Sequence, residues 1–213
     1  MTNTLLEKLE QQRPNANWIT KQSGLPYLPL QMNVPTKDIM AEWNDVKEIA
    51  VKHRDSDTLL NLKNKGWMSL TLFGAGATIT TQSDDKYDWT EIQSKCPATK
   101  EWFEQTFSRE NFYGRIRFML LEPGGHILPH KDRDSNGLSE VNIAINNPAG
   151  CSFHMENRGI LPFKEGSAIM LDLSNRHWVV NKSNEPRLHM IYHGNVPSNI
   201  IEKSYENLYY SKK

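Results

Sequence analysis

Cysteine is scarce in this 213-residue sequence, which carries only Cys96 and Cys151, far apart and in no C-x-x-C pair. A disulfide framework or a cysteine-based zinc site needs more cysteines at closer spacing. Neither is therefore expected, and we predict a protein with reduced thiols and a cytoplasmic location.

Long apolar runs and an excess of charge of one sign are also missing. No segment approaches the ~20 apolar residues of a membrane-spanning helix, and MTNTLLEKLEQQRPN lacks the basic and apolar regions of a signal peptide. The 25 basic residues balance 25 acidic ones without forming a basic cluster. We therefore expect neither a membrane nor a nucleic acid as partner.

What is present is the composition of a folded protein, with 38% apolar and 23% charged residues. The length allows one sizeable core, and we expect residues 1–64 to form a helical extension packed on it. In VPTKDIMAEWNDVKEIAVKHR, Thr36 is placed to cap a helix. An apolar stripe follows at helical spacing, as on a helix face packed against a core, and consists of Ile39, Met40, Trp43, Val46, Ile49 and Ala50.

From Trp67 the spacing of apolar residues changes to that of strands. GWMSLTLFGAG predicts a strand ending in a glycine turn, and PATKEWFEQTF predicts a short helix capped by Thr99. Short segments rich in Ile, Val, Leu, Met and aromatic residues follow, each bounded by Gly, Pro, Asn or Asp. This pattern predicts a β-sandwich or barrel. The final segment, 196–213, is a tail to which we assign no element.

Alternation within one of these segments separates two faces. On an extended chain Val141, Ile143 and Ile145 point one way, while Asn142 and its alternate neighbours point the other. We expect the first face to pack in the core. The second face either lines a small polar pocket or faces solvent, and the sequence leaves both open.

His130 and Asp132 stand in the stretch LPHKDRD, shortly after the turn EPGG. Residues two apart on an extended segment point the same way, so both side chains could bind one ion. His177, in SNRHWVV, could add a third ligand from a strand that pairs nearby. Two imidazoles and one carboxylate form the facial triad of non-heme Fe(II) oxygenases. The H-x-D spacing also arises by chance, with a histidine in a surface loop and an aspartate in a turn.

Arg187 follows at the start of a further predicted strand, in NEPRLHMIYHG. A guanidinium group is suited to bind a carboxylate through two hydrogen bonds. Beside an open iron site, such a clamp is what a dicarboxylate co-substrate needs. The alternative is a surface ion pair with Glu185.

Three stretches, LLEPGGHILPHKD, GSAIMLDLSNRHWVVN and EPRLHMIYH, together resemble the aspartyl/asparaginyl β-hydroxylase family of Fe(II)- and 2-oxoglutarate-dependent dioxygenases. That family includes free-proline hydroxylases. Its pattern has a PGG-type turn, an H-x-D or a single His, a G-x-x-x-x-(F/L)-D-x-S-x-x-H segment and a later Arg. All of these occur here in the same order.

The resemblance implies a mainly β fold, with a double-stranded β-helix (jelly roll) over residues 65–195 as the catalytic domain. It implies that His130, Asp132 and His177 hold Fe(II), and that Arg187 holds the C5 carboxylate of 2-oxoglutarate. The implied activity is hydroxylation of an amino acid, free or peptidyl, with O2 consumed and succinate and CO2 released. In carrying Asp132, the chain is similar to the free-amino-acid branch.

One family feature is missing. Many members carry R-x-H soon after H-x-D as a contact to the co-substrate, whereas GLSEVNIAI has neither residue. Asn142 or Arg117 could supply that contact. His189 alternates with Arg187, so we expect it to support the site or to contact the substrate, and we assign His126 the same kind of role.

Two other classes of function stay open at this point. A cupin-like metalloprotein that does not use 2-oxoglutarate would need the same three ligands but not Arg187. A non-enzymatic jelly-roll binding module would need none of them. The sequence also leaves open which substrate is used, the oligomeric state and the role of the N-terminal region.

Overall fold

The structure is a computed structural model that describes residues 14–53, 63–81, 86–107, 113–134 and 136–210. Its helices are α2 (Ala16–Lys21), α3 (Thr36–Val46), η1 (Lys47–Ile49), η2 (Glu91–Lys95), α4 (Pro97–Thr106) and α5 (Ser198–Tyr210). Its strands are β1 (Tyr27–Leu30), β2 (Val51–Lys52), β3 (Lys65–Gly74), β4 (Asp88–Trp89), β5 (Tyr113–His130), β6 (Glu140–Ala144), β7 (Cys151–Met155), β8 (Gly159–Ile160), β9 (Ala168–Leu171), β10 (His177–Asn181) and β11 (Arg187–Gly194). Of the helices described, none has the length and apolar character needed to cross a lipid bilayer.

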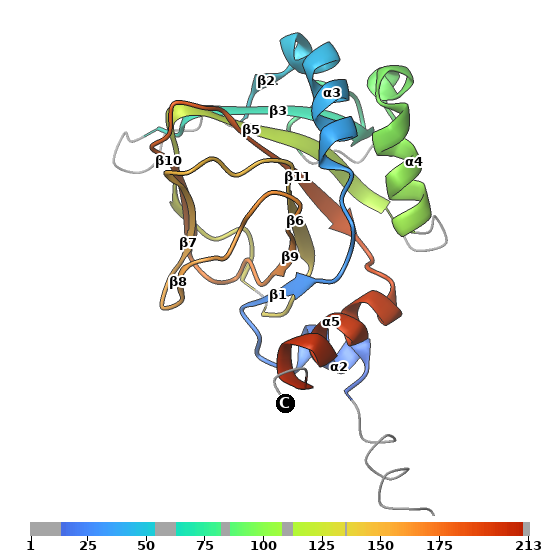
Figure 1. The fold of residues 1–213 in the computed structure, drawn as a ribbon, viewed down its shortest axis with the longest axis vertical. Coiled ribbons are helices and arrows are strands. Elements are labelled where there is room, and N and C mark those ends of the chain that lie inside the picture. The colour runs from blue at the N-terminus through green and yellow to red at the C-terminus, as the bar shows by residue number, and fades with distance from the viewer. Residues whose placement is uncertain (1–13, 54–62, 82–85, 108–112, 135, 211–213) are drawn as a thin grey trace, which may run out of the picture.

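The strands form one curled antiparallel sheet, and the long strand β5 runs through both halves of it. The order across the sheet is β1-β9-β6-β11-β5-β10-β7-β8, and β3 pairs with β5 as well as with the short β2 and β4. The first half of β5 lies between β3 and β11, whereas its last residues pair with β10, with His130 opposite His177. The sheet therefore folds back on itself (Figure 1).

The bend in β5 coincides with the EPGG turn. Gly124 has a φ of +68°, which side chains disfavour, and a Cβ on Gly125 would lie 2.7 Å from a backbone oxygen of β3. The buried side-chain amide of Asn181 donates to the carbonyl oxygen of Glu122 at 3.2 Å. Glycine and this amide together turn β5 from one half of the sheet into the other, which carries His130 to the end of the strand.

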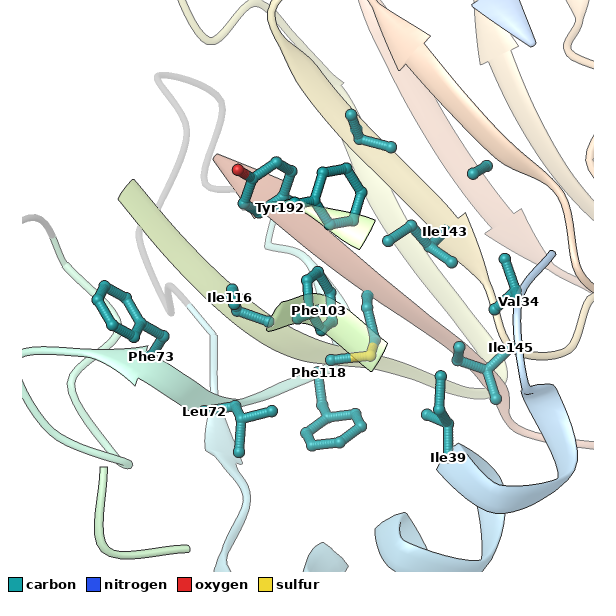
Figure 2. Close-up of a cluster of buried hydrophobic side chains, with 14 of the residues drawn as sticks. Val34, Ile39, Leu72, Phe73, Phe103, Ile116, Phe118, Ile143, Ile145 and Tyr192 are labelled. Atoms are coloured by element: carbon teal, nitrogen blue, oxygen red, sulfur yellow. The ribbon is translucent and has the colours of Figure 1, made fainter. Parts of the chain in front are cut away.

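Helices α3 and α4 cover the outer face of β3, β5 and β11 (Figure 1). Apolar side chains fill the space between the strands and these helices, and Figure 2 shows Phe103 of α4 among the strand residues Ile116 and Ile143. Val141 and Ile143 of β6 are fully buried in this cluster. The predicted packing of that face of β6 is therefore confirmed.

The N-terminal part contributes strands as well as helices. β1 pairs with β9, with Leu28 opposite Met170, and β2 pairs with β3. Helix α2 lies beside α5 (Figure 1), and the backbone N–H of Ala16 donates to the Glu202 carboxylate at 3.0 Å. The segment 196–213, to which the sequence assigns no element, thus contains a helix that packs on the N-terminal part.

Both predicted helix caps are wrong. Helix α3 begins at Thr36 itself, whose hydroxyl donates to Glu165 at 2.9 Å. Helix α4 begins at Pro97, whose fixed φ suits a first turn. The backbone N–H and the hydroxyl of Thr99 donate to the carboxylate of Glu42 on α3, at 2.9 and 2.5 Å. A residue distant in the sequence therefore satisfies the start of α4, which local spacing does not reveal.

Candidate metal centre and pocket

A cavity of about 240 Å³ lies inside the curled sheet. Its walls come from β3, β5, β6, β7, β9, β10 and β11, and mix polar with apolar side chains. Most of the predicted site residues line it, namely Arg117, His130, Asp132, Asn142, His177 and Arg187. Asn142 thus faces the pocket, so the polar face of β6 lines a cavity and does not face solvent.

The H-x-D residues and the later histidine meet at one place on the cavity wall. His130 ends β5, His177 begins β10, and the two are paired across the strands. Asp132 follows β5, where its backbone N–H donates to the carbonyl oxygen of Leu173 at 3.2 Å. His130 Nε2 lies 3.5 Å from Asp132 Oδ1, and His177 Nε2 lies 3.6 Å from Asp132 Oδ2. One donor atom from each residue lies within 4.8 Å of the other two.

Backbone contacts orient both imidazole rings. His130 Nδ1 lies 2.7 Å from the carbonyl oxygen of Leu128, and His177 Nδ1 lies 3.0 Å from that of Asn175. A carbonyl oxygen only accepts, so each Nδ1 carries the proton and each Nε2 lone pair points toward the shared centre. Burial, and then the charge of His130, lower the pKa of His177. That ring is therefore held neutral, which is the form that binds a metal.

The donor set fits a first-row divalent metal ion. Two imidazole nitrogens and one carboxylate oxygen form the triad typical of non-heme Fe(II) oxygenases, and thiolates that would select zinc or copper are not part of it. Asp132 offers a different oxygen toward each histidine. The residues present are therefore suited to hold Fe(II).

Arg187 lies on the same cavity wall but is almost fully buried, at 3% exposed. Burial lowers its pKa to about 10, so the guanidinium is still charged near neutral pH. Its Nη2 lies 2.7 Å from His189 Nδ1, and the same ring nitrogen lies 2.5 Å from Asn142 Oδ1. A guanidinium has five N–H donors and His189 Nδ1 can take only one of them, which leaves other N–H groups available to an anion.

Among the residues that the structure describes, none forms an ion pair with Arg187. Its Nε and the Nε2 of His189 are buried without a hydrogen-bond partner among the residues described. Burial, and then the charge of Arg187, hold the pKa of His189 well below its usual value, so that ring is neutral. A buried cation without a paired anion is unfavourable. The site is therefore suited to receive a carboxylate, and the alternative of a surface pair with Glu185 does not fit this burial.

Two other predicted site residues, Arg117 and His126, lie apart from the metal ligands and Arg187. Arg117 lines the cavity, but its Nη2 lies 3.0 Å from His193 Nε2, further along the strands than Arg187. His126 is not part of the cavity lining, and its Nε2 lies 3.1 Å from the carbonyl oxygen of Lys63. The structure therefore brings Arg117 to the pocket and leaves His126 beside a neighbouring backbone.

Three charged or titratable residues on the strands that line the cavity were missed by the sequence analysis, namely Arg115, Glu140 and His193. Strand alternation could have found them. Arg115 stands two residues before Arg117, and Glu140 stands two before Asn142, so each shares a face with a candidate. His193 likewise shares the parity of Arg187 on β11. His53 and Trp67 also line the cavity, and no sequence signal marked them.

Comparison with known proteins places these residues in context. Residues 35–197 match the family model described as aspartyl/asparaginyl beta-hydroxylase. No significant match is found among curated proteins.

Solved structures of low sequence identity share the fold. One is a 2OG-Fe(II) oxygenase family oxidoreductase from Burkholderia pseudomallei, with 13% identity, 76% of this chain and 82% of that chain covered, and a TM-score of 0.50. Another is a Pseudomonas putida prolyl-4-hydroxylase, with 14% identity, coverage of 81% and 93%, and a TM-score of 0.50. A third is a Trichoplax adhaerens prolyl hydroxylase in complex with a hypoxia inducible factor peptide fragment, with 10% identity, coverage of 95% and 97%, and a TM-score of 0.51. These likenesses confirm the predicted double-stranded β-helix.

Proposed function

The chain belongs to the aspartyl/asparaginyl β-hydroxylase family of Fe(II)- and 2-oxoglutarate-dependent oxygenases, and from this premise we propose that its pocket hydroxylates an amino acid. The reaction consumes O2 and 2-oxoglutarate and releases succinate and CO2. One oxygen atom enters a C–H bond of the substrate, and the other enters the new carboxylate of succinate. The observation that supports this proposal is that a His-Asp-His set and a buried arginine line the same cavity, and that the arginine has no ion-pair partner within the described parts of the chain.

His130, Asp132 and His177 would hold the iron. When bound, Fe(II) supplies the activation of O2, which side chains alone do not perform. The chain contributes two imidazoles whose proton positions are fixed by backbone carbonyl groups and a carboxylate that offsets part of the ion's charge. Three protein ligands leave further coordination positions for the co-substrate and oxygen.

Arg187 binds the C5 carboxylate of 2-oxoglutarate in this proposal. A charge-assisted pair with a planar guanidinium fixes both position and orientation of a carboxylate. Because Arg187 is almost fully buried, water screens the interaction little, and the pair is stronger than it would be at the surface. His189 contacts the guanidinium and Asn142 contacts His189, which gives His189 a direct and Asn142 an indirect role in positioning Arg187 for the co-substrate.

Apolar side chains keep water out of the pocket. Ile127, Phe153 and Val179 line the cavity and are no more than 7% exposed. Phe153 also stacks parallel to the ring of His177, with ring centroids 5.6 Å apart. A dry site directs a reactive oxidant to the substrate and suppresses side reactions with solvent.

Succinate release tests this proposal. Purified protein with Fe(II), 2-oxoglutarate and O2 is screened over free amino acids and short peptides, and succinate and a product heavier by one oxygen atom are measured together. We expect both to form in equal amounts with at least one substrate. His130→Ala should abolish the reaction, while His154→Ala, on another strand and outside the cavity lining, should retain it. Turnover that persists in His130→Ala contradicts the assigned metal centre.

A further inference from the structure

A tight turn, residues 172–176, joins β9 to β10, the strand that begins with the metal ligand His177. We propose that Asp172 is a positioning residue for the metal centre. Its buried carboxylate holds the 172–176 turn in the shape that orients Asp132 and His177. This assignment rests on the proposed function and adds a residue, outside the ligand set, that controls how tightly the ion is bound.

Backbone groups of the 172–176 turn contact two of the three metal ligands. The carbonyl oxygen of Leu173 accepts from the backbone N–H of Asp132 at 3.2 Å. The carbonyl oxygen of Asn175 lies 3.0 Å from Nδ1 of His177 and accepts its proton. The first bond holds the chain that follows β5, and the second orients an imidazole ring. The positions of both ligands therefore depend on the shape of this turn.

Asp172 makes hydrogen bonds that give the 172–176 turn its shape. Its Oδ1 accepts from the backbone N–H of Ser174 at 3.1 Å and from the Ser174 hydroxyl at 2.7 Å. Its carbonyl oxygen accepts from the backbone N–H and the side-chain amide of Asn175, at 3.2 and 3.0 Å. An aspartate that accepts from the backbone two residues later is a common way to close a turn. Leu173 lies inside this turn, which fixes the direction of its carbonyl group.

Asp172 also connects the turn to its surroundings. Its backbone N–H donates to the carbonyl oxygen of Pro26, in the segment before β1, at 2.9 Å. Nη2 of Arg133 lies 3.9 Å from Oδ1 of Asp172 and also donates to the carbonyl oxygen of Gly137. Because Arg133 directly follows Asp132, this ion pair joins the segment that carries a metal ligand to the 172–176 turn.

The Asp172 carboxylate does not itself belong to the metal centre. Leu171 and Leu173 line the cavity, whereas Asp172 between them is not part of the lining. In the described part of the chain, the group of donor atoms that could hold one ion does not include Asp172 either. Asp172 can therefore act on the metal through the shape of the turn, and not as a ligand or a substrate contact.

Burial makes the hydrogen bonds of Asp172 difficult to replace. Asp172 is 7% exposed and Ser174 is 9% exposed, so water has little access to either side chain. Without the carboxylate, the backbone N–H of Ser174 loses its acceptor, and a buried donor without an acceptor is unfavourable. The turn should then rearrange. Loss of a group that orients metal ligands typically weakens metal binding by roughly 10–100-fold.

Metal titrations test the assignment without turnover. Metal-free protein is titrated anaerobically with Fe(II), and separately with Co(II), whose visible absorption reports the geometry of its ligands. We expect Asp172→Ala to bind both ions roughly 10–100-fold more weakly than the wild type. The absorption of bound Co(II) should also change, because the ligands are no longer held in the same directions. Both titrations are performed well below the melting temperature of each variant, so that folded proteins are compared.

Two further variants separate the shape of the turn from the charge of Asp172. In Asp172→Asn an acceptor oxygen remains in place without the charge, so this variant should keep most of the affinity that Asp172→Ala loses. In Asp172→Glu the charge remains but the carboxylate is displaced by one methylene group, so this variant should bind the ions more weakly than Asp172→Asn. The comparison of these two variants decides the assignment if Asp172→Ala does not fold.

Asp134→Ala is the matched control, because it removes an exposed carboxylate two residues from Asp132. It should bind both ions as the wild type does.

Three results overturn the assignment. The first is wild-type affinity and an unchanged Co(II) absorption in Asp172→Ala or Asp172→Glu, which would limit Asp172 to a role in folding. The second is an equal loss of affinity in Asp172→Asn and Asp134→Ala, which would assign the effect to charge and not to the turn. Both of these results leave the proposed function intact. The third is a wild type that binds neither ion, which rejects the metal centre of the proposed function and this assignment with it.

Discussion

The two faces of β5, β6 and β11 carry different kinds of side chains. On the outer face, Phe118, Ile143 and Met190 are fully buried under α3 and α4 in an entirely apolar layer. The residues next to these in each strand point to the inner face. They include polar or charged groups, such as Arg117 and Asn142, that line the cavity. The same backbone therefore carries a stabilising surface on one side and a binding surface on the other.

This difference shows where the strands are free to carry function. Tight apolar packing on the outer face supplies stability through removal of apolar surface from water. Buried charge on the inner face costs stability unless a ligand completes it. The stability supplied by the outer face thus offsets the cost of buried charge on the inner face. Substitutions on the outer face should mainly lower stability, whereas substitutions on the inner face should mainly lower ligand binding.

The largest expected difference is between neighbouring residues of β5. Phe118→Ala should lower the free energy of unfolding by about 3–5 kcal/mol, because it opens a cavity in the packed layer. Met119→Ala should cost about 2 kcal/mol or less, since Met119 borders an existing cavity and belongs to neither packed cluster. Chemical denaturation of the metal-free proteins measures both. Equal losses of unfolding free energy in the two variants would contradict the view that the outer face supplies most of the stability.

Binding of Fe(II) should stabilise the folded protein, and this stabilisation should require the side chains of the metal ligands. An ion at a hundredfold excess over its Kd raises the stability by about 2.7 kcal/mol, so anaerobic Fe(II) should raise the melting temperature of the wild type. His130→Ala and Asp132→Ala should lose this increase almost completely. Their metal-free stability should stay within about 0.5 kcal/mol of the wild type, because both side chains are partly exposed. A full metal-induced shift in either variant would contradict the assigned ligands.

A smaller effect should appear in the pH dependence of stability. Burial, and then Arg187, hold the pKa of His189 in the folded protein well below its usual value of 6.5. Below pH 6.5 the unfolded chain therefore binds a proton that the folded chain does not, and stability falls as the pH falls. The contribution is at most about 1.4 kcal/mol per pH unit for one group.

Comparison of the metal-free wild type with His189→Gln isolates this contribution. We expect the loss of stability between pH 7 and pH 5 to be smaller in His189→Gln. Part of the slope should remain, because the pKa of His177 is also lowered. His154→Gln, at a partly exposed position of β7, is the matched control and should keep the wild-type slope. An unchanged slope in His189→Gln would show that this ring is not buried as described.

Patterns along single strands predicted much of the site. The i, i+2 spacing of His130 and Asp132 predicted that they meet one ion with His177, and the structure brings the three together within 4.8 Å. Alternation in β6 predicted its apolar face and left the place of Asn142 open, which the cavity resolves. Features set by a single stretch of chain were therefore accessible to sequence reasoning.

Features that depend on residues distant in the sequence could not be predicted from local patterns. The first turn of α4 is satisfied by Glu42 of another helix, so the cap predicted from Thr99 is wrong. The apolar stripe of α3 was extended to Ile49, which is 37% exposed because the α-helix ends at Val46 and continues as a 3₁₀ turn. A 3₁₀ turn has three residues per turn, which moves later residues off the packed face.

Arg187 offers the most direct test of the account, because it separates a 2-oxoglutarate enzyme from a protein that only binds metal. Two anaerobic titrations suffice: Fe(II) into the protein, and then 2-oxoglutarate into the iron-loaded protein, followed by calorimetry and by the weak visible charge-transfer absorption. The same titrations are performed on Arg187→Ala, Arg187→Lys and the exposed control Arg158→Ala.

We expect unchanged Fe(II) binding in all three variants, since none of them alters a metal ligand. Loss of one partner of a buried charge pair costs roughly 2–5 kcal/mol, so Arg187→Ala should bind 2-oxoglutarate tens to thousands of times more weakly. Arg187→Lys should fall between this variant and the wild type, because lysine keeps the charge but not the planar pair of donors. If Arg187→Ala binds 2-oxoglutarate as tightly as the wild type does, the buried arginine is not the co-substrate clamp, and the central claim is contradicted.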